Sequence, residues 1–130
     1  MSLKADIVVV GAGHAGCEAA LAAARLGQRV VMVTMRIDHI GRLSCNPAVG
    51  GLAKGNLVRE IDALGGAMAK VADACTIQFR RLNTRKGLAV QSSRAQVDID
   101  LYPKTMRAEI ESCAGIELIA DEVVDLQVDG

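Results

Sequence analysis

A β-branched run that breaks at a cluster of glycines is the feature that most constrains what this chain can fold into. Ile7 to Val10 are all apolar, and Gly11-Ala12-Gly13-His14-Ala15-Gly16 follow directly. An alanine-rich run then continues to Leu26 and stops at Gly27. This order predicts a strand, a tight turn and a helix, with the glycines spaced as G-x-G-x-x-G.

Each glycine of this loop has a separate physical role in a dinucleotide site. Gly11 permits the sharp turn, Gly13 lets the backbone approach a pyrophosphate, and Gly16 lets the helix lie close to the strand. The helix N-terminus offers unpaired N–H groups and a positive dipole end to the same anion. Because the strand and helix flank the glycines, we favour a dinucleotide site over a bare structural turn. The predicted cofactor-binding residues are Gly11, Ala12, Gly13, His14, Ala15 and Gly16.

Composition narrows the class of protein. The 130 residues have the size of one domain, and 51% of them are hydrophobic, enough for an aliphatic core. Fifteen basic and fifteen acidic residues cancel, so any surface for nucleic acid must be local. No apolar run is long enough to span a bilayer, and the N-terminus lacks the pattern of a signal peptide. We expect a cytoplasmic chain.

The cysteines fit a reduced chain without a metal site. They are widely spread, and none forms C-x-x-C or a ligand cluster with His14 or His39. Three of them, Cys17, Cys75 and Cys113, are predicted to be small apolar packing residues.

A second apolar run, Arg29 to Val33, completes a β-α-β unit with a right-handed crossover. A dinucleotide fold usually places a carboxylate at the end of this strand, to bind the adenosine ribose. None is present here; Thr34 offers a hydroxyl, and Asp38 comes slightly late. Arg36 has two interpretations, a contact to the 2′-phosphate of NADP or a solvated loop arginine, and we prefer the second.

The stretch from Asp38 to Gly55 is rich in glycine and is predicted to be a functional loop. It contains Cys45 between turn-forming residues, with Arg42 nearby in sequence. A neighbouring cation or exposed turn amides favour the reactive thiolate. Cys45 is therefore a candidate catalytic residue, and the alternative is a buried loop cysteine without chemistry.

A basic stretch from Thr76 to Val97 contains no acidic residue. It is either an RNA-binding strip or a loop whose charges are solvated or serve cofactor phosphates. Phe79 is its only aromatic residue, which disfavours stacking of single-stranded bases. The basic residues are Arg80, Arg81, Arg85, Lys86 and Arg94.

The remaining periodicity predicts an α/β fold over residues 1–130. Helices are expected at Asn56–Leu64 and Ala67–Ala74. A further helix, with Ser93 or Asp98 as its cap, either begins near Tyr102 with Pro103 in its first turn or is kinked at Pro103. Ile116 to Ala120 reads as a third parallel strand, and Glu122 to Val128 as a half-exposed edge strand. The fold class is a partial doubly wound parallel sheet, a Rossmann-like half, with an extra C-terminal edge strand. Such an incomplete sheet is expected for the N-terminal part of something longer.

Three segments carry a resemblance to a known family. They are GAGHAGCEAALAAARLG, GRLSCNPAVGGLAKGNLVREIDALGG and NTRKGLAVQSSRAQVD. Together they resemble the start of the glucose-inhibited division protein A family. That family is the FAD-containing subunit of the enzyme that installs 5-carboxymethylaminomethyl at the wobble uridine of certain tRNAs.

The resemblance implies site residues as well as chemistry. Residues Gly11 to Gly16 match the loop that holds the FAD pyrophosphate, Val123 the backbone position that meets adenine, and Cys45 a cysteine near the flavin. A second family cysteine lies beyond this chain. The implied cofactors are FAD here, with NADH and methylenetetrahydrofolate in the full-length protein. The implied partners are tRNA and a tRNA-modification GTPase, through regions absent here, and a second copy in a homodimer.

Two alternatives stay open. One is a folate- and FAD-dependent tRNA uracil methyltransferase or another two-dinucleotide flavoprotein, which the S-C-N-P-A-V-G-G stretch disfavours. The other is a non-catalytic nucleotide-binding fragment, since half a sheet covers too little of a ligand to bind it well. We expect the isolated 130-residue chain to be inactive.

Overall fold

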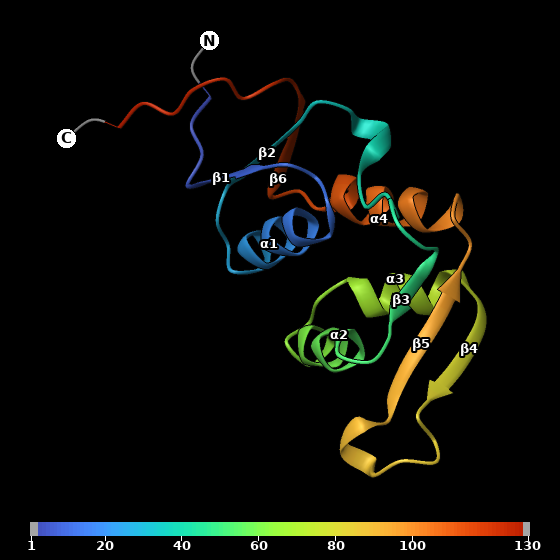
Figure 1. Cartoon of the computed structure of the whole chain (residues 1–130). Helices are drawn as coiled ribbons and strands as arrows, with labels where there is room; N and C mark the ends of the chain where they lie inside the picture. Colours follow the sequence, from blue (N-terminus) through green and yellow to red (C-terminus); the bar gives the residue numbers. More distant parts are fainter. Residues whose placement is uncertain (1–2, 129–130) are drawn as a thin grey trace.

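The computed structural model describes residues 3–128, which contain two small sheets and the helices that pack on them (Figure 1). One sheet is parallel, with strand order β1-β2-β6, and the other is antiparallel, with strand order β3-β5-β4. In chain order the elements are β1 (Ile7–Val10), α1 (His14–Arg25), β2 (Val30–Thr34), η1 (Ile37–His39), β3 (Ala48–Gly50), α2 (Lys54–Ala63), α3 (Met68–Cys75), β4 (Thr76–Leu82), η2 (Leu88–Val90), β5 (Ser92–Val97), α4 (Leu101–Ser112) and β6 (Ile116–Ala120).

The parallel sheet confirms the predicted partial doubly wound half. Helix α1 joins β1 to β2, and α4 leads into β6 on the other side of β2. The chain moves from β1 to β2 and from β2 to β6 in the same direction across the sheet. Right-handed connections therefore place both helices on the same face. There α1 and α4 pack together, and the core between them includes Tyr102, Met106 and Ile110, all fully buried.

The opposite face of the parallel sheet is open at β1 among the described residues, although Val31 of β2 is buried on that face. Val8 is 59% exposed and Val10 is 63% exposed, while Val9 packs against the core. The unbroken apolar run from Ile7 to Val10 would suit a strand that is buried on both faces, but β1 is buried on one face only within residues 3–128. An unbroken apolar run shows what a strand is able to bury, and burial also requires an element that covers the face.

The predicted C-terminal edge strand is also wrong. Residues 121–128 leave β6 as extended chain without strand pairing, although the N–H of Asp121 still donates to the carbonyl oxygen of Thr34 at 3.0 Å. Alternating apolar and polar residues define two faces. They do not supply the neighbouring strand that a ladder of hydrogen bonds requires.

The basic stretch predicted as a strip or loop is largely a β-hairpin. Strand β4 pairs with β5 in antiparallel register, and β5 also pairs with the short strand β3. Helices α2 and α3 pack on the face that carries Ala95 and Val97, which are both buried. Arg94 and Gln96 alternate with them and are exposed on the other face.

Helix α4 begins as the sequence predicts. The Asp98 Oδ1 atom accepts hydrogen bonds from the N–H groups of Asp100 and Leu101, at 2.9 and 2.8 Å. Pro103 then lies in the first turn, where its missing N–H has no helical partner to lose. These bonds confirm Asp98 as the cap, whereas Ser93 lies inside β5.

The cap at Asp98 makes the stability of this half depend on pH. Hydrogen bonds from the Leu101 and Asp100 N–H groups lower the pKa of Asp98 below its ordinary value of 3.8. The carboxylate thus contributes stability above pH 3.8, and this contribution is lost as pH falls through the lower folded-state pKa. We expect Asp98→Ala to destabilise the protein at pH 7, with a smaller difference from wild type at pH 3. Urea unfolding at both pH values measures this, and Asp73→Ala, an exposed helical carboxylate, is the control. A difference that does not shrink at pH 3 would contradict the cap.

The buried hydroxyl of Tyr102 gives a second test. The side chain is fully buried, and its oxygen has no hydrogen-bond partner among the described residues. An unpaired buried hydroxyl destabilises, so we expect Tyr102→Phe to leave stability unchanged or raise it by about 1 kcal/mol. Tyr102→Ala should cost roughly 3–5 kcal/mol through the cavity it leaves. Urea unfolding compares the two variants. A loss of more than about 1 kcal/mol in Tyr102→Phe would show that the hydroxyl is satisfied after all.

Candidate functional site

The glycine loop has the shape that a dinucleotide turn requires. Gly11 has a φ of +97°, in the region that favours glycine, and its N–H donates to the Val33 carbonyl oxygen at 2.8 Å. A Cβ at Gly16 would collide with the Gly11 carbonyl oxygen. The first turn of α1 therefore crosses β1 at a distance that only glycine permits.

Gly13 faces open space. A Cβ built there meets no heavy atom within 4 Å, and its φ of −72° is ordinary. Gly13 is also the N-cap of α1, where no side chain caps the helix and no acidic residue lies in the first turn. The N–H groups of this turn have no intrahelical acceptor, so the loop fits an anion such as the FAD diphosphate.

His14 adds no positive charge to this loop. Its ring lies edge-on to that of Tyr102, with centroids 5.9 Å apart, and its Nδ1 is buried without a partner in the described chain. Burial lowers the pKa of His14, so the ring is neutral at pH 7. An anion at the loop is therefore held by backbone N–H groups and the helix dipole.

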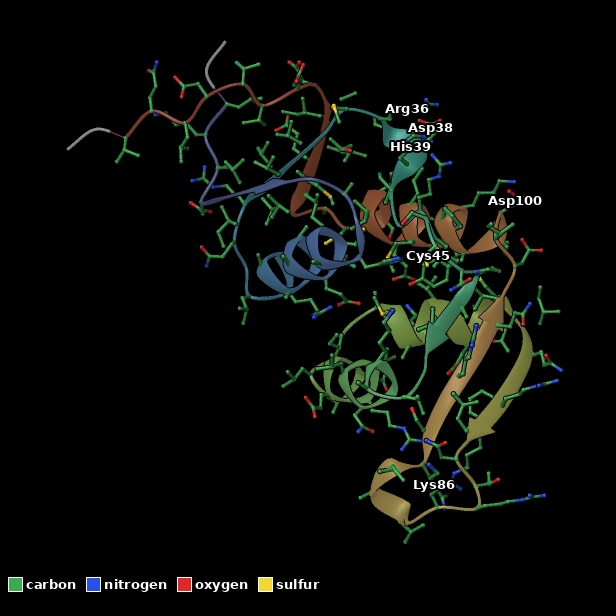
Figure 2. All side chains as sticks on the ribbon, in the orientation of Figure 1. Arg36, Asp38, His39, Cys45, Lys86 and Asp100 are labelled. Carbon is green, nitrogen blue, oxygen red and sulfur yellow. The ribbon has the colours of Figure 1, made fainter. Side chains whose placement is uncertain are left out.

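The end of β2 favours the solvated interpretation of Arg36. Its guanidinium forms an ion pair with Asp38, with Nη2 and Oδ2 2.6 Å apart, and both side chains are more than half exposed (Figure 2). Arg36 lowers the pKa of Asp38. The Thr34 hydroxyl lies 3.5 Å from the Arg36 carbonyl oxygen, a weak contact that leaves it available.

The glycine-rich stretch after β2 is tied to the glycine loop. The N–H of Gly41 donates to the Ala12 carbonyl oxygen at 2.9 Å. Ile40 and Leu43 are buried, and Gly41 packs so closely on Met106 that a Cβ would crowd that side chain. Residues Arg36 to Cys45, which include the start of this stretch, thus form an ordered wall beside the glycine loop.

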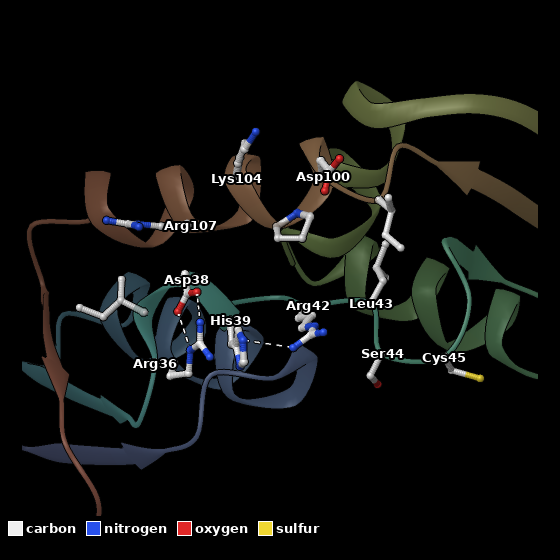
Figure 3. Close-up of a pocket in the computed structure, with 13 residues that line it drawn as sticks. Arg36, Asp38, His39, Arg42, Leu43, Ser44, Cys45, Asp100, Lys104 and Arg107 are labelled. Atoms are coloured by element: carbon white, nitrogen blue, oxygen red, sulfur yellow. Dashed lines mark hydrogen bonds and ion pairs between the residues drawn. The ribbon is translucent and has the colours of Figure 1, made fainter.

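A groove of about 820 Å³ runs between this wall and α4 (Figure 3). The wall contributes Arg36 and Arg42, and α4 contributes Lys104 and Arg107. Asp38 and Asp100 also line the groove, so its formal charge is positive. Sequence reasoning missed the α4 side of this groove; its only signal is two cations three residues apart on a helix.

Cys45 lies at the rim of this groove and is exposed. The Asn46 Nδ2 group donates to its sulfur at 3.5 Å. Arg42 instead contacts His39, with 3.1 Å between Nη1 and Nε2, and Cys45 points away from it (Figure 3). The alternative of a buried loop cysteine is therefore wrong, but the cation near it in sequence is directed elsewhere.

The other cysteines pack as predicted. Cys17 and Cys75 are buried, and Cys113 packs against the core while half-buried. Burial raises the pKa of Cys17 to about 11, so it stays a thiol. Cys45 is the exposed thiol among the described residues. No group of three potential metal ligands occurs within residues 3–128, and none of the helices described there could span a membrane.

Val123 follows the end of β6. Because the three strands are parallel, their C-terminal ends lie together, and Gly11 leaves β1 at this same end of the sheet. Val123 is 45% exposed and lies in the extended chain after the strand. Its position suits a backbone contact to a dinucleotide that crosses this edge.

Comparisons with known proteins agree with this geometry. The family described as "Glucose inhibited division protein A" matches residues 6–130. A tRNA uridine 5-carboxymethylaminomethyl modification enzyme MnmG from Desulfotalea psychrophila is 65% identical over 118 residues, which are 91% of this chain and 18% of that protein. Its counterpart from Pelobacter propionicus is 58% identical over 96% of this chain and 20% of its own length.

Solved structures give the same result. GidA from Aquifex aeolicus superposes with a TM-score of 0.94 at 54% identity, over 97% of this chain and 21% of that one. PqsL from Pseudomonas aeruginosa, a probable FAD-dependent monooxygenase, is 18% identical with a TM-score of 0.55 over 88% of this chain and 32% of its own, and shares the fold alone. The chain spans about a fifth of the length of the curated relatives it matches. It belongs to the glucose inhibited division protein A family.

Proposed function

We propose that residues 1–130 form the N-terminal part of an FAD-binding domain in a flavoenzyme that modifies tRNA. The modification is the addition of a carboxymethylaminomethyl group to C5 of the wobble uridine, which the names of the relatives describe. The observation that carries the proposal is the glycine loop. It combines an open Gly13, an uncapped helix N-terminus and a Gly16 pressed against Gly11.

The backbone of the loop is the proposed diphosphate site. The N–H groups of His14, Ala15 and Gly16 point from the first turn of α1 toward the space in front of Gly13, and the backbone at Val123 would meet the adenine. FAD, when bound, supplies hydride acceptance from NADH and handling of a one-carbon unit from methylenetetrahydrofolate. The chain itself holds and orients the cofactor and shields one side of it.

Cys45 is the proposed catalytic residue. As a thiolate it would add to a carbon centre or assist a proton transfer. Its support is an exposed sulfur at the rim of a positively charged groove, next to the wall that is bonded to Ala12. Buried Cys17 and Cys75 lack this access.

The partners belong to the proposal as well. Family membership supports tRNA as substrate, a tRNA-modification GTPase as partner, and a homodimer in the cytoplasm. The relatives are about five times longer than this chain, and their remaining length offers room for these contacts. The uracil methyltransferase alternative has no support among the relatives named above.

The open face of the parallel sheet favours a second candidate. With Val8 and Val10 exposed, the isolated chain is a non-catalytic nucleotide-binding fragment that is prone to self-association. Purified protein distinguishes the two candidates, since yellow protein with flavin absorbance retains FAD and colourless protein that elutes as a dimer does not.

Two glycine variants test the loop. We expect Gly13→Ala to keep the fold, because its Cβ meets open space, but to weaken FAD binding at least tenfold, about 1.4 kcal/mol, by blocking the diphosphate. Gly16→Ala should lower stability itself, because its Cβ would strike the Gly11 carbonyl. Flavin retention and thermal unfolding of the full-length protein measure both effects. Wild-type FAD affinity in Gly13→Ala would contradict the assignment.

Cys45 is tested by replacement in the full-length protein. We expect Cys45→Ser to abolish uridine modification while FAD binding and thermal stability stay unchanged, because the side chain is exposed. Mass spectrometry of digested tRNA measures the modification, and Cys113→Ser, which removes a half-buried thiol that does not line the groove, is the control. Normal modification by Cys45→Ser would remove the thiol from the mechanism.

A further inference from the structure

The open face of the antiparallel sheet carries two arginines directly opposite each other. Arg80 of β4 is paired in register with Arg94 of β5, and Gln78 is paired with Gln96 on the same face. Beyond β5, the register places Gly50 of β3 opposite Arg94. A hollow of about 290 Å³ lies on this face, lined by Gln78, Arg80, Leu82, Arg94 and Gln96.

This arrangement lacks an internal explanation. Like charges directly opposite on neighbouring strands repel each other and destabilise a sheet. The ion pairs within residues 3–128 use Arg29, Arg36, Lys70 and Arg107, so neither Arg80 nor Arg94 has a carboxylate partner there. The whole hairpin from 76 to 97 contains no acidic residue. An anion bound between the two guanidinium groups would attract both of them and offset their mutual repulsion.

The side chains that line the hollow are suited to binding phosphate groups. Guanidinium groups bind phosphate oxygens in bidentate fashion, and two of them side by side match the charge of consecutive phosphates. Glutamine amides add neutral donors that bond the same oxygens. No aromatic ring lines the hollow, because Phe79 alternates to the opposite face. The surface is therefore suited to a sugar-phosphate backbone and lacks a platform for stacked bases.

The position of the hollow on the sheet defines the path that a bound nucleic-acid strand would follow. Lys86 lies at the tip of the hairpin, and Cys45 lies at the other end of the sheet, just before β3 (Figure 2). Arg80 and Arg94 lie between these two ends on β4 and β5. A strand of nucleic acid laid along this face would run from the hairpin tip toward the exposed thiol.

We propose that the Arg80–Arg94 face binds backbone phosphates of the tRNA substrate and guides the strand toward Cys45. The inference rests on the proposed function, because it takes tRNA as the polyanion. It adds a location and a mode of contact that is independent of base sequence.

The test uses the full-length protein with FAD bound. The variant is Arg80→Gln/Arg94→Gln, and its affinity for a tRNA transcript is measured by fluorescence anisotropy across a KCl series. We expect affinity to fall at least tenfold at low salt. The slope of log K against log[KCl] should become shallower by roughly 1.4–1.8, since each lost phosphate contact removes about 0.7–0.9. FAD content should equal that of wild type.

Two further variants control for charge and folding. Lys4→Gln/Arg25→Gln removes two exposed charges from the parallel-sheet half and should leave the slope unchanged. Arg80→Lys/Arg94→Lys keeps both charges, so its salt slope should equal that of wild type, while its affinity should recover only in part because lysine cannot form the bidentate contact. A slope as shallow as that of Arg80→Gln/Arg94→Gln would overturn the proposal, because the arginines would then serve folding or a different contact.

The remaining outcomes are equally decisive. Wild-type affinity and slope in Arg80→Gln/Arg94→Gln would overturn the proposal and leave the proposed function standing. Loss of FAD would assign the face to the cofactor, and an unchanged slope with lower thermal stability would assign it to an acidic segment of the longer protein. A wild-type protein that holds FAD but binds no tRNA would overturn the proposed function as well.

Discussion

The fold depends on the close approach of helix α1 to strand β1. Gly16 touches the Gly11 carbonyl, and Gly11 in turn bonds to Val33 of the neighbouring strand. These contacts fix the direction of the helix axis relative to the sheet edge. The uncapped N–H groups therefore point to one place outside the sheet, and the candidate site exists because of that alignment.

The wall from Arg36 to Cys45 extends this alignment to the rest of the site. It is bonded to the loop through Gly41 and Ala12, and it is anchored in the core by Ile40 and Leu43. Its other side forms a groove with α4, whose start is capped by Asp98. A single ordered segment thus joins the glycine loop, a positively charged groove and the exposed thiol of Cys45.

Sequence reasoning succeeded where the chemistry is local. The β-α-β unit followed from Ile7 to Val33, because glycine spacing and apolar runs act within a few residues. The hairpin was missed because the alternation of Ile77 and Phe79 with Gln78 and Arg80 is short, and a stretch of basic residues is equally typical of a solvated loop. The groove was missed because it joins residues after β2 to α4, which only the folded chain brings together. The predicted edge strand at 122–128 is absent because its sequence alternates correctly but no neighbouring strand pairs with it.

The neutral ring of His14 determines how the loop responds to acid load. A loop that held its ligand through an imidazolium would bind an anion more tightly as the pH falls and more weakly as the pH rises. Here the pKa of the ring is lowered by burial against Tyr102, and the donors are peptide amides, which do not exchange charge with the medium. Binding of a dinucleotide at this loop would then not depend on an imidazolium charge at neutral pH.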